Sequence, residues 1–320
     1  MRQVPLGQTG VQVSALCFGC MHIGTRIPED TSYQLLDQYF EAGGRFLDTA
    51  NAYAFWVEGC HGGESEALLG RWMSTRQNRS EIFLATKVGA RPTVPGADLE
   101  RAEGLSRQAI EQAVHTSLRR LGTDYIDLCY AHIDFRWNPL EETLEAFDDL
   151  VKAGKIRYLG CSNFTTWRIE QARQMSKIHG WTSFCCAQQR YTYLRPRHGI
   201  NHQYWPPASE ELLDYCREHS DFSLLAYSPL LEGAYTGKKP LPEPYQGPDT
   251  DARLRTLQAV AQEVGTTTNQ LVLAWLLQSS PIVLPLIGAS NPDQLRENLG
   301  SLQIHLDLEQ MSRLTLAAGR

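Results

Sequence analysis

Four polar side chains stand where apolar, strand-like runs of this sequence end. In FLDTANAY, which spans residues 46–53, the carboxylate of Asp48 follows two apolar residues, and Tyr53 lies five residues further on. Lys87 closes the apolar run in FLATKVG, and His132 closes the run in LCYAHID. Because a buried charge is unfavourable unless it is paired, we expect Asp48 to have a cationic partner, and Lys87 is the natural candidate.

A phenol beside such an ion pair can exchange a proton with a substrate. We expect the Lys87 ammonium to favour the phenolate and to lower the pKa of Tyr53 from its ordinary value of about 10. A neutral His132 imidazole could hydrogen-bond a carbonyl oxygen and orient it. Reduction of an aldehyde or ketone by hydride needs such a donor and no nucleophile or metal, so we expect Tyr53 to be a general acid or base.

Each of these residues also has a structural interpretation. Asp48 and Lys87 could form a buried structural ion pair, and Tyr53 and His132 could be core residues with satisfied hydrogen bonds. Their joint placement at successive strand ends favours a site instead. A metal-dependent hydrolase is disfavoured, because no H-x-H motif or carboxylate cluster accompanies the single histidine.

Strand-like runs alternate with amphipathic, helix-like patterns along the whole sequence. We predict eight strands, near residues 15–19, 45–48, 82–87, 125–131, 156–161, 184–188, 223–227 and 283–287. The predicted helices lie at 30–42, 63–74, 106–121, 139–153, 166–178, 209–219, as a pair within 250–279, and at 292–301. This alternation predicts a single (β/α)8 TIM barrel domain over residues 1–320, with an N-terminal β-hairpin and a C-terminal helix.

A barrel of this kind brings the polar strand ends together. Neighbouring strands lie about 5 Å apart, and catalytic side chains sit at the carboxyl ends of the strands. The longest irregular stretches, 193–208 and 229–249, both follow a strand and would overhang the same face as substrate or cofactor loops.

Composition favours a small-molecule ligand. The 320 residues are 42% hydrophobic with a net charge of -6, and the scattered basic residues give no footprint for nucleic acid or an anionic membrane. The amino terminus lacks a signal-peptide core, so we expect a cytoplasmic protein. The eight cysteines, including the C-x-x-C of Cys17 and Cys20, fit reduced core thiols better than disulfides or a metal site.

Six segments in this order resemble the aldo-keto reductases: FLDTANAY, LATKVG, YAHID, GCSNF, AQQRY and AYSPLLEGAYTGK. The resemblance covers nearly the whole chain. It implies a barrel that binds NADPH across its carboxyl face, and this sequence indeed lacks a G-x-G-x-x-G fingerprint after a strand. It also implies a catalytic tetrad of Asp48, Tyr53, Lys87 and His132, with Tyr53 as general acid or base.

The same resemblance assigns cofactor contacts. It places Ser162, Asn163 and Gln188 at the nicotinamide carboxamide and Tyr227 against the nicotinamide ring. It places the pyrophosphate along Ser228, Leu230, Gly233 and Lys238. A P-loop interpretation of GAYTGK fails, because the spacing is one residue short and Lys239 replaces the required Ser or Thr.

The segment PLIGASNPDQLREN, residues 285–298, resembles the version found in potassium-channel β subunits. Many members of the family carry a basic residue where Ser290 stands, to pair with the 2'-phosphate of NADP. Here a hydroxyl, an amide and a helix amino terminus could take that role, with Arg296 as extra charge. NADP(H) is therefore favoured, with NAD(H) as the alternative, and the implied contacts are Gly288, Ser290, Gln294, Glu297 and Asn298.

The candidate substrate pocket is lined by loop residues, foremost Trp56 and Trp137. Aromatic and polar side chains in these loops suit a sugar-like or aromatic carbonyl compound; the others are Phe55, Arg136, Tyr193, Arg195, His202 and Trp205. Two further hypotheses remain. One is an NAD-dependent sugar or alcohol dehydrogenase, and the other is a nucleotide-sensing subunit like the channel β proteins, although His132 stands where those carry asparagine. Substrate, direction and oligomeric state stay open.

Overall fold

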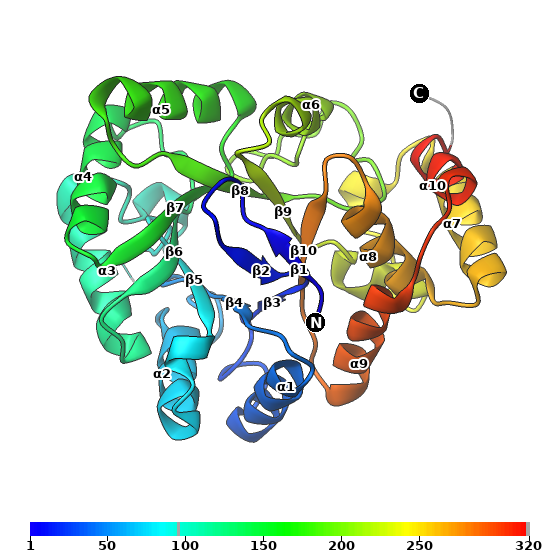
Figure 1. The fold of residues 1–320 in the computed structure, drawn as a ribbon, viewed down its shortest axis with the longest axis horizontal. Helices are drawn as coiled ribbons and strands as arrows, with labels where there is room; N and C mark the ends of the chain where they lie inside the picture. The colour runs from blue at the N-terminus through cyan, green and yellow to red at the C-terminus, as the bar shows by residue number, and fades with distance from the viewer. Residues whose placement is uncertain (95–96, 318–320) are drawn as a thin grey trace.

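Eight parallel strands close into a barrel in the computed structural model, which describes residues 1–94 and 97–317 (Figure 1). Around the barrel the order is β10-β3-β4-β5-β6-β7-β8-β9. The strands are β3 (Cys17–Gly19), β4 (Phe46–Asp48), β5 (Phe83–Val88), β6 (Ile126–Ala131), β7 (Ile156–Ser162), β8 (Phe184–Arg190), β9 (Ser223–Tyr227) and β10 (Val283–Ile287).

Helices surround the barrel, and α10 packs outside them against α7 and α8 (Figure 1). In α3, Ile110, Val114 and Leu118 lie on the buried face, Ser106 caps the first turn, and Gly122 ends the helix in a left-handed conformation. The helices are α1 (Glu29–Glu41), α2 (Glu64–Arg76), α3 (Arg107–Leu121), α4 (Leu140–Lys152), α5 (Thr166–His179), α6 (Glu210–Glu218), α7 (Thr250–Val264), α8 (Thr268–Gln278), α9 (Pro292–Gly300) and α10 (Leu308–Thr315).

A hairpin of β1 (Gln3–Pro5) and β2 (Gln12–Ser14) lies across one end of the barrel (Figure 1). Its turn begins with Leu6, which is fully buried in the core. The backbone N–H of Gly7 donates to Ser223 Oγ at 2.7 Å. Gly7 has a φ of 51°, and a Cβ there would lie 2.5 Å from the Asp221 carbonyl oxygen, so only glycine fits this contact.

The predicted barrel, hairpin and C-terminal helix are confirmed, and the observed strands and helices begin and end within two residues of the predicted positions. One loop differs. The stretch 229–249 contains two short 3-10 helices, Leu231–Thr236 and Glu243–Tyr245, which periodicity cannot predict because each is too short.

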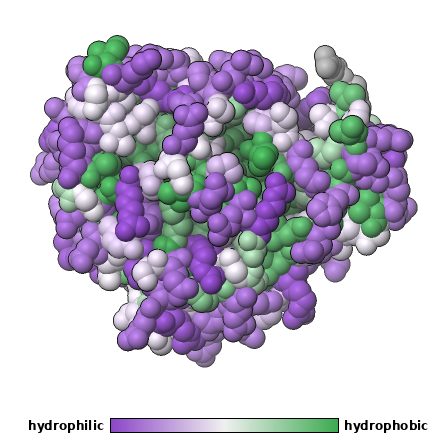
Figure 2. Space-filling view, viewed as in Figure 1, coloured by the Kyte–Doolittle hydropathy of each residue, from purple (hydrophilic) through white to green (hydrophobic). Residues whose placement is uncertain are grey.

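Figure 2 shows the face that carries the hairpin, where hydrophilic side chains dominate and smaller hydrophobic areas lie between them. All eight cysteines are free, and Cys17 and Cys20 are fully buried. Burial raises the pKa of both thiols, which disfavours the thiolate needed for redox or metal chemistry. Within the described part of the chain, no helix is long and apolar enough to cross a membrane.

Truncating the hairpin's anchor should destabilise the barrel. We expect Leu6→Ala to lower the free energy of unfolding by about 2–5 kcal/mol, because the change leaves a cavity under the hairpin. Urea unfolding followed by circular dichroism measures the change. Gln12→Ala, at an exposed position of the same hairpin, is the control. An equal effect of both variants would show that the hairpin does not seal the barrel end.

Candidate active site

A buried ion pair lies at the carboxyl end of the barrel. Lys87 is 1% exposed and Asp48 is 0% exposed. The Lys87 ammonium donates to Asp48 Oδ1, to the Thr49 carbonyl oxygen at 2.9 Å and to the Tyr53 hydroxyl oxygen at 2.7 Å. Asp48 Oδ2 accepts from Gln188 Nε2 at 2.7 Å. All three ammonium protons are therefore used, and both carboxylate oxygens have a donor.

Main-chain hydrogen bonds fix the loop that presents the tyrosine. After β4 ends, Thr49 N–H donates to the Ala85 carbonyl at 2.9 Å, and Asn51 N–H donates to the Lys87 carbonyl at 3.0 Å. The loop thus continues along β5 before it turns. Tyr53 follows directly and remains partly exposed at the barrel mouth, where a substrate can reach its hydroxyl.

His132 occupies the adjoining position at the end of β6. Its backbone N–H donates to the Val88 carbonyl at 3.0 Å, and its carbonyl accepts from Asn163 Nδ2 at 3.0 Å. The imidazole centroid lies 6.2 Å from the Tyr53 ring. Its buried Nδ1 has no hydrogen-bond partner among the described residues.

Burial decides the protonation of the site. Burial raises the pKa of Tyr53 well above its ordinary value, and the Asp48 carboxylate raises it further. The sequence-based expectation of a lowered pKa was therefore wrong, because it weighed the nearby ammonium without the loss of hydration. Burial also raises the pKa of Asp48, against the opposing effect of Lys87. For His132, burial and Lys87 both lower the pKa well below 6.5, so the imidazole is neutral, as expected.

Three of the predicted carboxamide and ring contacts come together beside the tetrad. Tyr227 Oη donates to Asn163 Oδ1 at 2.8 Å, and Asn163 Nδ2 lies 2.9 Å from Ser162 Oγ. Asn163 has a φ of 61°, a left-handed conformation that turns the chain sharply after β7. Its link to the His132 carbonyl joins this cluster to the catalytic residues.

Two adjacent glutamines of β8 face opposite ways. Gln188 faces the barrel interior and binds Asp48, so its amide N–H supports the ion pair. Gln189, which the sequence analysis missed, accepts from Asn163 N–H at 2.6 Å and donates to the Phe164 and Pro206 carbonyl oxygens. Strand alternation in AQQRY was the available signal that the second amide holds the neighbouring loops.

The segment predicted to follow the pyrophosphate turns away from β9 through unusual backbone. Ser228 is exposed and has a φ of 53°, and Gly233 has a φ of 88° within the first 3-10 helix. Leu230 is the residue before that helix, and Lys238 lies exposed beyond it. The four predicted residues therefore share one short, sharply turning stretch next to Tyr227.

The loop before α9 presents a polar helix terminus. Asn291 caps α9 by accepting from Gln294 N–H at 3.0 Å. Gln294 Oε1 accepts from both the N–H and the hydroxyl of Ser290, at 2.8 and 2.9 Å, so its Nε2 is the free end of the amide. Arg296 pairs with Asp293 at 2.6 Å on the surface.

The remaining predicted contacts of this segment have structural partners. Asn298 is 3% exposed, and its Nδ2 donates to the Gly288 carbonyl at 2.9 Å, which holds the loop shape. Glu297 Oε1 accepts from Thr267 Oγ1 at 2.7 Å, at the start of α8. Glu297 is thus oriented by its neighbour, and Asn298 supports the backbone that a cofactor would meet.

Aromatic rings border the catalytic residues. The Trp56 ring lies edge-on to Tyr53 with centroids 6.4 Å apart, and the Trp205 ring lies edge-on to His132 with centroids 6.1 Å apart. Trp56 is 42% exposed, so much of its ring remains available to a ligand. The barrel mouth therefore combines two proton-bearing groups with flat apolar walls.

The other predicted residues of the substrate pocket differ in how exposed they are. Trp137 is 51% exposed and stacks on Phe135 with centroids 4.3 Å apart. Tyr193 is only 1% exposed and packs against Trp275, so its interpretation as a pocket wall was wrong: it anchors its loop to α8. The remaining candidates are partly or fully exposed: Phe55, Arg136, Arg195 and His202.

No metal site accompanies these residues: within 1–94 and 97–317, no group of three His, Cys, Asp or Glu side chains is arranged to hold a metal ion.

Residues 15–318 match the family model described as Aldo/keto reductase family. The chain is 33% identical over 318 residues to norsolorinic acid reductase stcV of Emericella nidulans, over 94% of this chain and 77% of that protein. It is 28% identical over 320 residues to an aryl-alcohol dehydrogenase of Pestalotiopsis microspora, over 95% and 78% of the two proteins. Among solved structures, the thermostable aldo-keto reductase Tm1743 in complex with the inhibitor epalrestat matches with a TM-score of 0.76 and 29% identity, over 98% of both chains.

The neutral, buried imidazole predicts a pH dependence of stability. Because the folded-state pKa of His132 is lowered, its contribution is present above the unfolded pKa of about 6.5 and is lost as the pH falls. Between pH 7.5 and 5.5 this loss amounts to at most about 1.4 kcal/mol. We expect His132→Asn to lose less stability than the parent over that interval in urea unfolding. Equal losses would mean that His132 protonates within the folded protein.

Proposed function

The chain belongs to the aldo/keto reductase family, and within it we propose that the protein is an NADP(H)-dependent oxidoreductase that reduces an aldehyde or ketone to an alcohol. The observation that carries this proposal is the short hydrogen-bonded chain from Asp48 through Lys87 to the Tyr53 hydroxyl. This chain of hydrogen bonds ends at Tyr53, which is partly exposed at the barrel mouth, whereas Asp48 and Lys87 are buried.

Each of the four residues has a separate role in proton transfer. Tyr53, protonated because burial raises its pKa, donates its proton to the carbonyl oxygen as negative charge develops there. The Lys87 ammonium, 2.7 Å from the hydroxyl oxygen, stabilises the phenolate that forms. Asp48 holds Lys87 in place, and the neutral His132 ring orients the carbonyl. Reduction begins from the protonated phenol, which is the form of Tyr53 present near neutral pH.

Residues beside the tetrad fit a nicotinamide cofactor, which supplies the hydride when it is bound. Ser162 and Asn163 offer a hydroxyl and an amide for its carboxamide, and Tyr227 offers a ring face held by its bond to Asn163.

The cofactor proposal extends to the 2'-phosphate of NADP(H). The amino terminus of α9 favours an anion, and Ser290 orients the free Nε2 of Gln294 as an additional donor. These neutral donors would replace the basic residue that many members of the family carry there.

For the substrate, the bordering rings favour an aromatic carbonyl compound over a sugar. Trp56 and Trp205 flank Tyr53 and His132, and flat apolar walls of this kind stack well on aromatic rings. Relatives named for norsolorinic acid and for aryl alcohols support this choice.

Removing one hydroxyl tests the mechanism. We expect Tyr53→Phe to lower turnover of an aromatic aldehyde by at least about 100-fold, because the proton donor is lost while the ring is kept. Cofactor affinity should stay within a few-fold in a fluorescence titration. Tyr130→Phe is the matched control, since its ring also lies near Lys87, at 5.7 Å, but is fully buried. Near-normal turnover of Tyr53→Phe would refute the assignment.

The cofactor preference is tested separately by quenching of intrinsic fluorescence with NADPH and NADH. We expect tighter binding of NADPH, and we expect Gln294→Ala to weaken NADPH binding by about tenfold, roughly 1.4 kcal/mol, because a donor to the 2'-phosphate is lost. NADH binding should change little. Equal affinity of the parent for both cofactors would contradict the proposed role of this helix terminus.

A further inference from the structure

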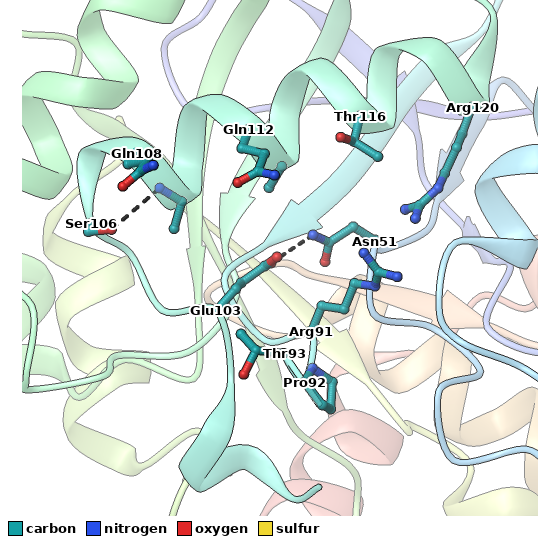
Figure 3. Close-up of a pocket in the computed structure, with 12 residues that line it drawn as sticks. Asn51, Arg91, Pro92, Thr93, Glu103, Ser106, Gln108, Gln112, Thr116 and Arg120 are labelled. Carbon is teal, nitrogen blue, oxygen red and sulfur yellow. Dashed lines mark hydrogen bonds between the residues drawn. The ribbon is translucent and has the colours of Figure 1, made fainter. Parts of the chain in front are cut away.

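A cavity of about 500 Å³ lies on the side of the barrel, between α3 and the loop that follows β5 (Figure 3). Most of its lining residues are polar, and none of Asp48, Tyr53, Lys87 and His132 is among them. The lining residues are Asn51, Arg91, Pro92, Thr93, Glu103, Ser106, Gln108, Ala109, Gln112, Ala113, Thr116 and Arg120.

Two consecutive glycines bring the two arginines of the cavity together. A Cβ on Gly62 would lie 3.4 Å from Arg91 Nε, and a Cβ on Gly63 would lie 2.3 Å from Arg120 Cζ. Both guanidinium groups therefore rest on adjacent backbone units that carry no side chain. Guanidinium groups attract anions, and Glu66 is the carboxylate of the described residues that pairs with Arg120.

The guanidinium groups are only partly satisfied by the protein. Arg120 Nη1 donates to the buried Glu66 at 3.2 Å. Arg91 Nε donates to the His61 carbonyl at 3.2 Å, and no carboxylate of the described residues lies within 4.0 Å of the Arg91 guanidinium nitrogens. The Nη groups of Arg91 are thus available to a ligand.

The cavity also holds a buried acceptor without a donor. Asn51 is 2% exposed, and its Oδ1 has no hydrogen-bond partner in the part of the chain that the structure describes. Its Nδ2 donates to Glu103 Oε1 at 2.7 Å, an oxygen that also accepts from Gly89 N–H. Figure 3 shows the Asn51 and Arg91 side chains beside one another, with the Glu103 carboxyl on the far side of the amide.

We propose that this cavity binds a small hydroxylated anion, of the size and chemistry of a sugar phosphate. Arg91 and Arg120 favour the anionic group. The unpartnered Asn51 Oδ1 requires a donor, which a ligand hydroxyl supplies. The amide and hydroxyl side chains of Gln112 and Thr116 bind further hydroxyl groups along α3. An anion without a proton to donate, such as sulfate, would leave the Asn51 acceptor unsatisfied.

The test is isothermal titration calorimetry of the full-length protein with glucose 6-phosphate. We expect saturable binding to a single site, and at least tenfold weaker binding of inorganic phosphate and of glucose, because each lacks half of the recognised groups. Absence of glucose 6-phosphate binding, or equal binding of inorganic phosphate, would overturn the proposal.

Variants locate the site. Arg91→Gln and the exposed, fold-neutral Gln112→Glu should each weaken glucose 6-phosphate binding at least tenfold, the second by repulsion of the anion. Arg101→Gln, an exposed arginine of the same loop outside the cavity, is the matched control and should bind within twofold of the parent. Lys238→Gln should also leave binding unchanged. Loss in Lys238→Gln instead would place the phosphate in the proposed cofactor site and overturn the inference, without touching the proposed function.

Discussion

The buried contact between Asp48 and Lys87 is the constraint on which the rest of the site depends. Neither charge is exposed to water, and removing one partner of such a pair costs about 3–5 kcal/mol because the other remains uncompensated. The barrel supplies the geometry, since β4 and β5 are neighbours and Asp48 lies opposite Ala85, two residues before Lys87. The lysine then has one proton left for Tyr53, so the ammonium group that pairs with Asp48 in the core also holds the phenol.

Burial gives the site its chemistry as well as its stability. A phenol with a raised pKa is a proton donor near neutral pH, and an imidazole with a lowered pKa is a neutral hydrogen-bonding group. For both residues, burial makes the largest contribution to the pKa shift, and nearby charges make a smaller one. The site therefore needs its apolar surroundings, including the tryptophan rings at the mouth, as much as it needs the four polar side chains.

The sequence was sufficient for the barrel and for the positions of Asp48, Lys87 and His132, because strand periodicity and strand-end polarity are local signals. It could not give the direction of the Tyr53 pKa shift, which depends on how completely the assembled barrel excludes water. Nor could it place Tyr193, since an aromatic residue in a long loop can face a ligand or the core. The cavity beside α3 has no motif, because its lining depends on how the loop after β5 folds against α3 and not on a regular residue spacing.

Glu103 joins the loop that leads to Tyr53 with the loop that begins after Lys87, through Asn51 and Gly89. The bond to Gly89 closes the second loop on itself, since Gly89 opens the segment and Glu103 lies near its end. The base of that segment is thereby fixed to the loop that leads to Tyr53. Because one carboxyl oxygen holds both loops, loss of the Glu103 side chain would free both of them at once.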